Sequence, residues 1–348
     1  MIMEKYGVLV VDDSALARKI IGAMIDNFPN FYCIGKARNG IDAIEKIKRL
    51  KPAIVTLDIE MPELDGLQTL KILMNEMPIP VMMLSNGAES TLEAIELGAV
   101  DFVIKHELIK ENNEAQIDDF YNRLNAAVTA KLPMPLHVEP KLEDSIVVDE
   151  KPIYKKNSNK ELLIIGSSTG GPSALQTILT KIPPSFPIPI VVIQHMPPGF
   201  TKPLADRFNG LCNLTVKEAE HNEVLEAGTI YIAPAGLQTT LKKSADGNFI
   251  VRQKITTLVE TLYKPSIDVT LLSIAEEVKD TLLTVILTGM GDDGLRGSKL
   301  VKKFGGTLVA ESEETCVVYG MPKVVFEAGL VDKQLPLPHI FDEIMRII

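Results

Sequence analysis

Short apolar runs alternate with segments in which apolar residues recur at helical spacing, and this pattern continues through both halves of the chain. A short apolar run between helical segments is typical of a strand, and strands connected through helices form parallel, doubly wound α/β sheets. We therefore predict two such sheets. Their expected strands are Val8 to Val11, Ile54 to Leu57, Val81 to Leu84 and Phe102 to Ile104, then Leu162 to Ile165, Ile188 to Ile193, Leu282 to Leu287 and Thr307 to Ala310.

The boundary between the sheets is marked by a helical pattern followed by a proline-rich segment. Apolar residues recur at helical spacing between Ile117 and Val128, which predicts an amphipathic helix that closes a first domain at residues 1–131. Residues 132–160 have mixed charges and no sustained period, so we interpret them as a linker to a second domain at residues 161–348. This linker contains Pro133, Pro135, Pro140, Pro152 and the polar run Lys155 to Lys160.

Composition and charge narrow the class of protein. The 348 residues exceed the usual size of one domain, and the formal net charge of −10 argues against a nucleic-acid partner. Cys33, Cys212 and Cys316 lack the spacing of a zinc site or a disulfide framework, which favours a reducing cytosol. The first residues carry no leader pattern, and no segment approaches the roughly 18 apolar residues of a membrane span. We therefore expect a soluble cytoplasmic protein that is not inserted in a membrane.

Acidic residues follow two of the strands expected in the first domain. Asp12 and Asp13 come directly after the first strand and Asp58 directly after the second, so all three are expected in one crevice at the carboxyl edge of the sheet. Carboxylates this close repel by about 4 kcal/mol per pair at an effective dielectric near 20, and a cation must offset that. Oxygen ligands suit Mg²⁺, while Lys105 and Ser85, after the other two strands, add an amine and a hydroxyl. Each residue taken alone also fits an ordinary helix cap or turn.

Taken together, these residues resemble a response-regulator receiver domain over residues 5–131, through Val11 to Ser14, Leu57 to Pro62 with Asp65-Gly66, and Gly98 to Lys105. The resemblance implies a flavodoxin-like fold in which Asp58 accepts a phosphoryl group from a sensor histidine kinase. It also implies that Mg²⁺ is held by Asp13, Asp58 and the Glu60 carbonyl with support from Asp12, that Ser85 and Lys105 contact the phosphoryl group, and that Phe102 is an aromatic switch. His106 departs from the pattern, because receivers usually have proline there.

A glycine-rich loop, Gly166 to Pro172, follows the first strand expected in the second domain. It matches neither the dinucleotide fingerprint nor the P-loop. Its first five residues do fit Gly-x-Ser-x-Gly, in which a serine sits on a tight turn between a strand and a helix with its hydroxyl exposed. A nucleophilic Ser168 is one interpretation of the loop; phosphate binding by helix amides and a merely flexible corner are the others.

Two further strand ends carry residues that a serine nucleophile needs. His195 follows the strand Ile188 to Ile193 and is a candidate base, and Asp292 and Asp293 follow Leu282 to Leu287 as candidates for the carboxylate that orients it. The glycines around these acids would let backbone amides approach a substrate, as an oxyanion hole demands. A structural histidine and an ordinary turn are the alternatives. The order Ser, His, Asp differs from that of the α/β-hydrolases.

The second domain resembles the catalytic domain of the CheB family, the chemotaxis protein-glutamate methylesterases, over about residues 160–347. That resemblance implies a Rossmann-like serine esterase fold with Ser168 as nucleophile, His195 as general base and acid, and Asp293 as the orienting carboxylate. The Thr169 and Met290 amides would form the oxyanion hole. It favours Ser168 over Ser167 and Asp293 over Asp292. It rests on Gly166 to Pro172, Gln194 to Pro197, Tyr231 to Pro234, Lys264 to Asp268, Leu287 to Gly294 and Val318 to Pro322, with departures at Ala235, Gln238 and Tyr263.

The combined resemblance implies an enzyme that removes γ-glutamyl methyl esters from methyl-accepting chemoreceptors and deamidates certain receptor glutamines. Both reactions would pass through an acyl-Ser168 intermediate without a cofactor for the esterase step. The receiver would cover the cleft until phosphorylation of Asp58 exposes Ser168. A transcriptional output is disfavoured because no helix-turn-helix pattern is present, and a catalytically silent module that docks on receptors or the kinase is the remaining alternative.

Overall fold

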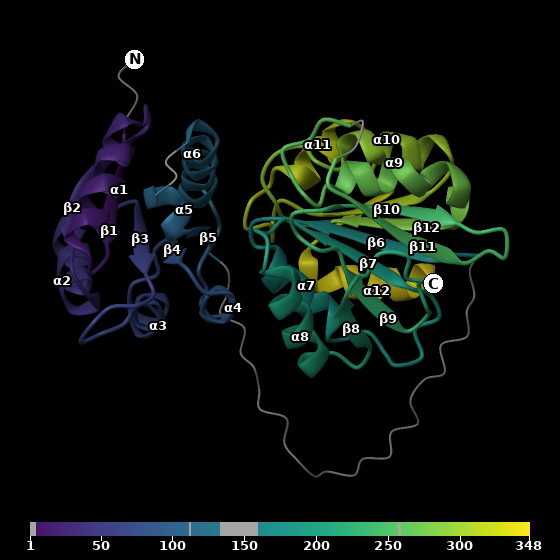
Figure 1. Cartoon of the computed structure of the whole chain (residues 1–348), viewed down its shortest axis with the longest axis horizontal. Helices are drawn as coiled ribbons and strands as arrows, with labels where there is room; N and C mark the ends of the chain where they lie inside the picture. Colours follow the sequence, from purple (N-terminus) through teal and green to yellow (C-terminus); the bar gives the residue numbers. More distant parts are fainter. Residues whose placement is uncertain (1–4, 111–112, 133–158, 257–258) are drawn as a thin grey trace, which may run out of the picture. The chain divides into compact units, whose positions relative to one another are not determined.

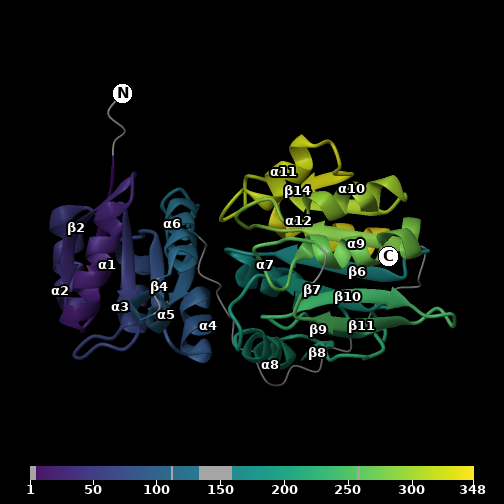
Figure 2. The same cartoon turned by 45° about the horizontal axis from the view of Figure 1, so that its top comes forward.

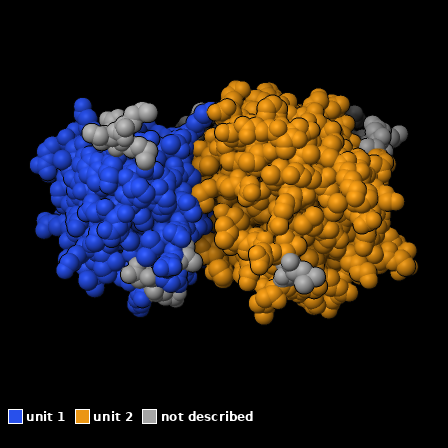
Figure 3. Space-filling model, turned by 90° about the horizontal axis from the view of Figure 1, so that it is seen from above, with its two compact units in different colours: residues 1–136 blue, residues 137–348 orange. Residues whose placement is uncertain are grey.

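The computed structural model of the chain describes residues 5–110, 113–132, 159–256 and 259–348. The chain divides into two compact units, residues 1–136 and 137–348, which Figure 3 colours separately. The linker predicted at residues 132–160, with its four prolines, lies almost entirely outside the described residues. None of the helices in the described ranges combines the length and the apolar character that crossing a bilayer requires.

The first unit contains a five-stranded parallel sheet with the strand order β2-β1-β3-β4-β5 (Figure 1). Its four predicted strands are confirmed, and one strand at the sheet's edge, β2, was not predicted. The strands are β1 (Tyr6–Val11), β2 (Phe31–Ala37), β3 (Ile54–Asp58), β4 (Val81–Ser85) and β5 (Asp101–Ile104), and the helices are α1 (Ala15–Asn27), α2 (Gly40–Leu50), α3 (Gly66–Glu76), α4 (Ala88–Glu96), α5 (Lys105–Lys110) and α6 (Glu114–Val128).

Two helices of this unit, α1 and α3, begin at side-chain caps in the segments that follow β1 and β3. The Ser14 hydroxyl accepts a hydrogen bond from the Ala17 amide at 3.3 Å and starts α1 immediately after the two aspartates. Asp65 forms a capping box with Gln68 and starts α3. The cap at Ser14 leaves only a short turn after β1, so Asp12 and Asp13 stay at the edge of the sheet, where Asp58 ends β3.

The second unit contains a seven-stranded parallel sheet with the order β14-β13-β12-β6-β7-β9-β8, and a separate antiparallel hairpin, β10-β11. The predicted parallel sheet is confirmed, whereas the hairpin and the strands β8, β9 and β14 were not predicted. The strands are β6 (Leu162–Ser167), β7 (Ile190–Gln194), β8 (Thr215–Glu218), β9 (Thr229–Ile232), β10 (Gln238–Lys243), β11 (Phe249–Lys254), β12 (Leu282–Ile286), β13 (Thr307–Glu311) and β14 (Lys333–Leu335).

Helices cover both faces of this sheet. Figure 1 shows α9, α10 and α11 on one face and α7, α8 and α12 on the other, and the hairpin strand β10 packs against α9 (Figure 2). The strands at the centre of the sheet, β6, β7 and β12, are buried along their whole length. The helices are α7 (Gly171–Leu179), α8 (Thr201–Leu211), α9 (Ile267–Val278), α10 (Leu295–Lys303), α11 (Met321–Glu327) and α12 (Leu337–Ile347), with a short 3-10 turn at Lys279–Thr281.

Strand β6 lies between β12 and β7 in the sheet, and this neighbourhood positions the second candidate site. Ser167 is paired with Gln194 of β7, and Gly166 is paired with Ile286 of β12. Because all three strands run parallel, the residues that follow them meet at one edge of the sheet. Ser168, His195 and the loop from Thr288 to Asp293 are therefore neighbours.

Candidate functional site

The turn after β6 separates its two serines. The Ser167 hydroxyl is fully buried and donates to Gln194 Oε1 at 2.6 Å. The Ser168 hydroxyl has no hydrogen-bond partner in the described part of the chain, although its backbone is fixed: its amide donates to the Thr288 carbonyl at 3.0 Å. Gly170, which caps the start of α7, has a left-handed φ of 76°, a backbone conformation that residues with a side chain rarely adopt. The hydroxyl available for chemistry is that of Ser168.

Gln194, the last residue of β7, ties the serine turn to the histidine beside it. Its Nε2 donates to the carbonyls of both Ser168 and His195 at 3.0 Å, while its Oε1 accepts from Ser167. The side chain is 1% exposed, so these bonds form in the interior. This role of Gln194 was not predicted from the sequence, although a polar amide that ends an apolar strand directly before a candidate base is a signal for it.

The His195 ring is oriented by Asp293. Its Nε2 lies 2.8 Å from Asp293 Oδ2, and because a carboxylate only accepts hydrogen bonds, this nitrogen carries the proton. The other ring nitrogen, Nδ1, is buried and has no hydrogen-bond partner among the described residues. Its lone pair is therefore available to a hydroxyl. Hydrogen bonds between a nucleophile and its base are often made only when substrate is bound.

Asp293 is held as a carboxylate at the amino end of α9. Its oxygens accept hydrogen bonds from the Ser266 hydroxyl at 2.8 Å and from the amides of Ile267 and Asp268 at 2.7 and 3.0 Å. Burial acts against the charge, but the bond to His195 and those to the helix amides outweigh it and hold the pKa of Asp293 below its usual range. Asp292 is exposed, so of the two candidate acids only Asp293 reaches the histidine.

The loop after β12 presses against the serine turn. The Thr288 hydroxyl donates to the Thr169 carbonyl at 2.9 Å, and its amide donates to the buried carboxyl of Glu311. At Gly289, a side chain would place its first carbon 2.7 Å from the Ser168 β-carbon, so only glycine fits there. The Met290 amide has no hydrogen-bond partner within the described ranges. Gly289 and Ser168 are thus in close contact, and the two predicted oxyanion donors, Thr169 and Met290, are the residues that come directly after Ser168 and Gly289 in the chain.

Of the three positions that depart from the family pattern, Tyr263 and Gln238 lie beside this site. The Tyr263 ring stacks on the His195 ring with centroids 3.9 Å apart and an angle of 7° between the planes. Gln238 is buried and donates to the Tyr263 carbonyl at 2.7 Å. The Ala235 amide donates to the Thr201 hydroxyl at 3.0 Å. The departures therefore occupy defined places in the structure.

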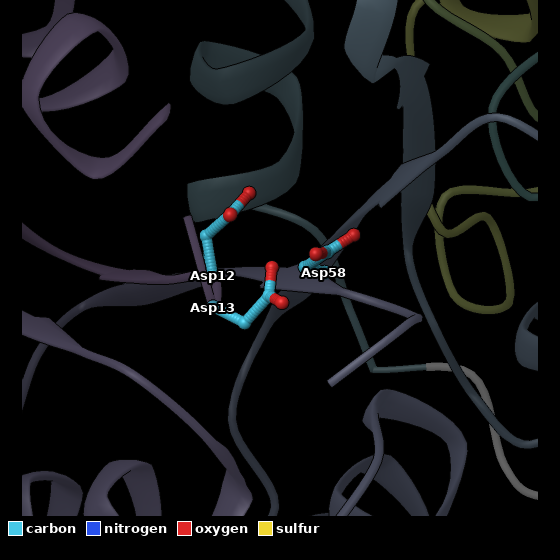
Figure 4. Close-up of side chains that lie close together, drawn as sticks. All are labelled: Asp12, Asp13 and Asp58. Carbon is cyan, nitrogen blue, oxygen red and sulfur yellow. The ribbon is translucent and has the colours of Figure 1, made fainter. Parts of the chain in front are cut away.

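In the first unit, Asp12, Asp13 and Asp58 converge at the carboxyl edge of the sheet (Figure 4). Each residue contributes one carboxylate oxygen to a group of three oxygens that lie within 4.8 Å of one another. Lys105 Nζ lies 2.6 Å from Asp58 Oδ2 and 2.9 Å from Asp12 Oδ2. Three carboxylates against one ammonium leave an excess of negative charge. This charge and the hard oxygen donors fit a divalent cation such as Mg²⁺.

The protonation of this cluster reflects burial and mutual repulsion. Burial, together with the charges of Asp12 and Asp13, raises the pKa of Asp58 to about 6 despite the opposing effect of Lys105. Burial disfavours the charge of Lys105 as well, but its bonds to Asp58 and Asp12 outweigh that effect and raise its pKa. Perturbed carboxylates in a crevice are typical of functional sites.

A cavity of about 190 Å³ opens beside the cluster and contains most of the predicted receiver residues. Phe102 is buried in β5 and does not line it, and Asp12 is fully buried behind it. The His106 amide donates to the Asn86 side chain at 3.0 Å, which joins the first turn of α5 to the loop after β4. The lining residues are Asp13, Asp58, Ile59, Glu60, Ser85, Asn86, Gly87, Ser90 and Lys105.

Comparisons with known proteins match both units. The family model of the response regulator receiver domain matches residues 8–114, and that of the CheB methylesterase matches residues 163–344. Proteins named protein-glutamate methylesterase/protein-glutamine glutaminase from Lawsonia intracellularis and Thermotoga maritima are each 41% identical to the chain. The alignments cover 97% and 98% of this chain and 98% of each relative.

A solved structure agrees with the second unit. The catalytic domain of the Thermotoga maritima CheB methylesterase is 45% identical, with a TM-score of 0.52, and the match covers 54% of this chain and 99% of that one. The relatives bear the names of enzymes, which supports an active enzyme rather than the silent docking module. The chain belongs to the CheB family, in which a response-regulator receiver domain precedes a methylesterase domain.

Proposed function

We propose that this chain is a phosphorylation-regulated esterase that hydrolyses γ-glutamyl methyl esters, and deamidates certain glutamines, with Ser168 as its nucleophile. The observation that carries the proposal is that two groups without hydrogen-bond partners among the described residues follow neighbouring strands. The Ser168 hydroxyl follows β6 and the buried Nδ1 of His195 follows the neighbouring strand β7, while Asp293 holds the opposite ring nitrogen. Membership of the CheB family supports the same reaction.

In the acylation step, His195 Nδ1 takes the proton of the Ser168 hydroxyl as Oγ bonds to the γ-carbonyl carbon of the substrate. The carbonyl oxygen becomes an oxyanion, and the amides of Thr169 and Met290 are the proposed donors to it. When the tetrahedral intermediate collapses, the imidazolium returns its proton to the leaving oxygen and methanol departs. From a glutamine, the same proton goes to the leaving nitrogen and ammonia departs.

In the deacylation step, His195 removes a proton from water, and the resulting hydroxide attacks the acyl-Ser168 carbonyl. The imidazolium then returns its proton to Ser168, which leaves a free glutamate carboxyl. Asp293 stays ionised throughout and stabilises the imidazolium through Nε2. The ring is turned relative to the trypsin-like arrangement, in which Nδ1 faces the aspartate.

In the receiver, we propose that Asp58 accepts the phosphoryl group from a chemotaxis-type histidine kinase. Asp13, Asp58 and the Glu60 carbonyl would hold Mg²⁺, which would supply positive charge to offset that of the transferred group, and Asp12 would support these ligands from its buried position. Lys105 and Ser85 lie at the cavity and would contact the phosphoryl oxygens. Phe102 would carry the change onward as an aromatic switch.

The proposed substrates are the methyl-accepting chemoreceptors, on helices that face the cytoplasm, and the proposed location of the enzyme is therefore cytoplasmic. Phosphorylation of Asp58 is expected to increase access of these helices to Ser168. The esterase reaction needs no cofactor in this mechanism, since every proton transfer uses His195.

The test of this proposal is methanol release from receptor membranes that carry labelled methyl esters. Ser168→Ala is expected to abolish release. Ser167→Ala removes a hydroxyl one residue away that donates only to Gln194, and is expected to keep most of the activity. Wild-type turnover by Ser168→Ala would refute the nucleophile. An undiminished response of Asp58→Ala to a small phosphodonor would refute the phosphorylation site.

A further inference from the structure

The Tyr263 ring is stacked face to face on the imidazole of His195. The centroids are 3.9 Å apart and the planes are within 7° of parallel. Tyr263 lies between β11 and α9, far in the sequence from the histidine it covers. The recorded ring contacts of His195 are thus an edge bond to Asp293 and a face contact to an aromatic ring.

The buried side-chain amide of Gln238 supports this stack. Gln238 Nε2 donates to the Tyr263 carbonyl at 2.7 Å, and Gln238 Oε1 accepts from the Ser266 amide at 2.9 Å. Ser266 in turn donates through its hydroxyl to Asp293. The side chain of Gln238 is 1% exposed, so both bonds are protected from water. Gln238 therefore connects Tyr263, which contacts the face of the His195 ring, with Ser266, which binds the carboxylate at the ring's edge.

The stack has different consequences before and after the serine is deprotonated. Beforehand the imidazole is neutral, and the ring over it contributes packing. Once Nδ1 takes the proton, the imidazole becomes a cation lying against the electron-rich face of an aromatic ring, which attracts positive charge at this distance. An interaction that strengthens as the imidazolium forms lowers the barrier and raises kcat.

We propose that Tyr263 is a positioning residue that acts through His195: it fixes the plane of the imidazole and stabilises the imidazolium formed in each proton transfer. The inference rests on the proposed role of His195 as the base. It assigns a role to a position that departs from the family pattern, and makes Gln238 its support. Among the described residues, the titratable side chains recorded against the His195 ring are Asp293 at its edge and Tyr263 on its face.

The first test compares Tyr263→Leu with Tyr263→Phe. Phenylalanine keeps the aromatic face, and we expect kcat within about twofold of wild type; leucine removes it, and we expect kcat to fall about 3- to 30-fold with little change in KM. Leu262→Ala, at the exposed neighbouring position, is the control and should leave kcat and KM unchanged.

A second test keeps the fold constant. Starting from the Tyr263→Phe variant, the phenylalanine is exchanged for its mono-, di- and trifluorinated analogues. These keep the shape of the ring and progressively weaken the negative charge on its face. We expect kcat to fall stepwise along the series. A flat series, or a Tyr263→Leu enzyme whose only change is a higher KM, would overturn the proposal and leave Tyr263 as a wall of the substrate site. Ser168→Ala is measured alongside. An active Ser168→Ala enzyme would refute the proposed serine mechanism, whereas an inactive one together with a flat series would refute only the role of Tyr263.

Discussion

Asp293 Oδ2 lies 2.8 Å from Nε2 of the His195 ring, and the same carboxylate accepts hydrogen bonds from two amides and a hydroxyl at the start of α9. An asparagine at position 293 would keep the size but present an NH₂ group to a nitrogen that must stay protonated. The wrong tautomer would then be favoured. We expect Asp293→Asn to lower kcat by about 10³- to 10⁴-fold, as judged from methanol release.

Asp292→Asn is the matched control for this substitution. It removes the same charge from the adjacent position and is expected to leave kcat within about twofold of wild type, because the Asp292 side chain is exposed and does not bind His195. Equal losses in the two variants would mean that the loop as a whole, and not the bond to His195, supports the reaction.

The positions of these residues could be predicted from the sequence because they depend on strand ends. Ser168, His195 and Asp293 each follow an apolar run, and in a parallel sheet such residues gather at one edge. The contacts between their side chains could not be predicted. The choice of Nε2 by Asp293 and the stacking of Tyr263 depend on loops from distant parts of the chain, whose course no local pattern describes.

The missed strands have a similar physical explanation. β14 is a three-residue edge strand with no buried residue, so it produces no apolar run. β2 also lies at the edge of its sheet, and only its two end residues, Phe31 and Ala37, are buried, so its sequence does not have the continuous burial of the central strands. The β10 strand begins with Gln238, whose burial is balanced by hydrogen bonds to Tyr263 and Ser266. A polar residue buried in this way is not recognisable as part of the core from sequence alone.

Gln194 is predicted to be a positioning residue for both the nucleophile and the base. Gln194→Glu has the same shape but places an oxygen against the carbonyls of Ser168 and His195, which lose their donor. We expect the free energy of unfolding to fall by about 3 kcal/mol and kcat to fall at least tenfold. Denaturant unfolding and methanol release measure the two effects. Ser167→Ala, which removes the third partner of the same amide, should lower stability but cost far less in kcat.

The acidic cluster is predicted to bind Mg²⁺ through Asp13. Titration with Mg²⁺ should stabilise the wild-type receiver by about 1 to 3 kcal/mol at saturating concentrations, because the ion offsets the repulsion among Asp12, Asp13 and Asp58. Asp13→Asn should lose most of this gain, whereas Asp118→Asn on the exposed side of α6 should keep it. Calorimetric titration measures binding directly. The same heat of binding in Asp13→Asn and wild type would exclude Asp13 as a ligand.

The buried carboxyl of Glu311 is predicted to make stability depend on pH. Burial raises the pKa of its carboxyl above the usual 4.5, against the opposing hydrogen bonds from Thr288 and Thr315. Glu311 therefore holds its proton more tightly in the folded state than in the unfolded state. The stability that this proton contributes is fully present below pH 4.5 and is lost as pH rises through the pKa of the folded state.

Glutamine at position 311 can accept from the Thr288 amide as the carboxyl does, but it does not titrate. The advantage in melting temperature of Glu311→Gln over wild type should therefore grow as pH is raised from 5 to 8, while methanol release is retained because the loop after β12 keeps its anchor. Glu313→Gln removes a carboxyl from an exposed position two residues along and should show no such trend. An advantage that shrinks with rising pH would mean that Glu311 is stabilised as a carboxylate, contrary to the effect of its burial.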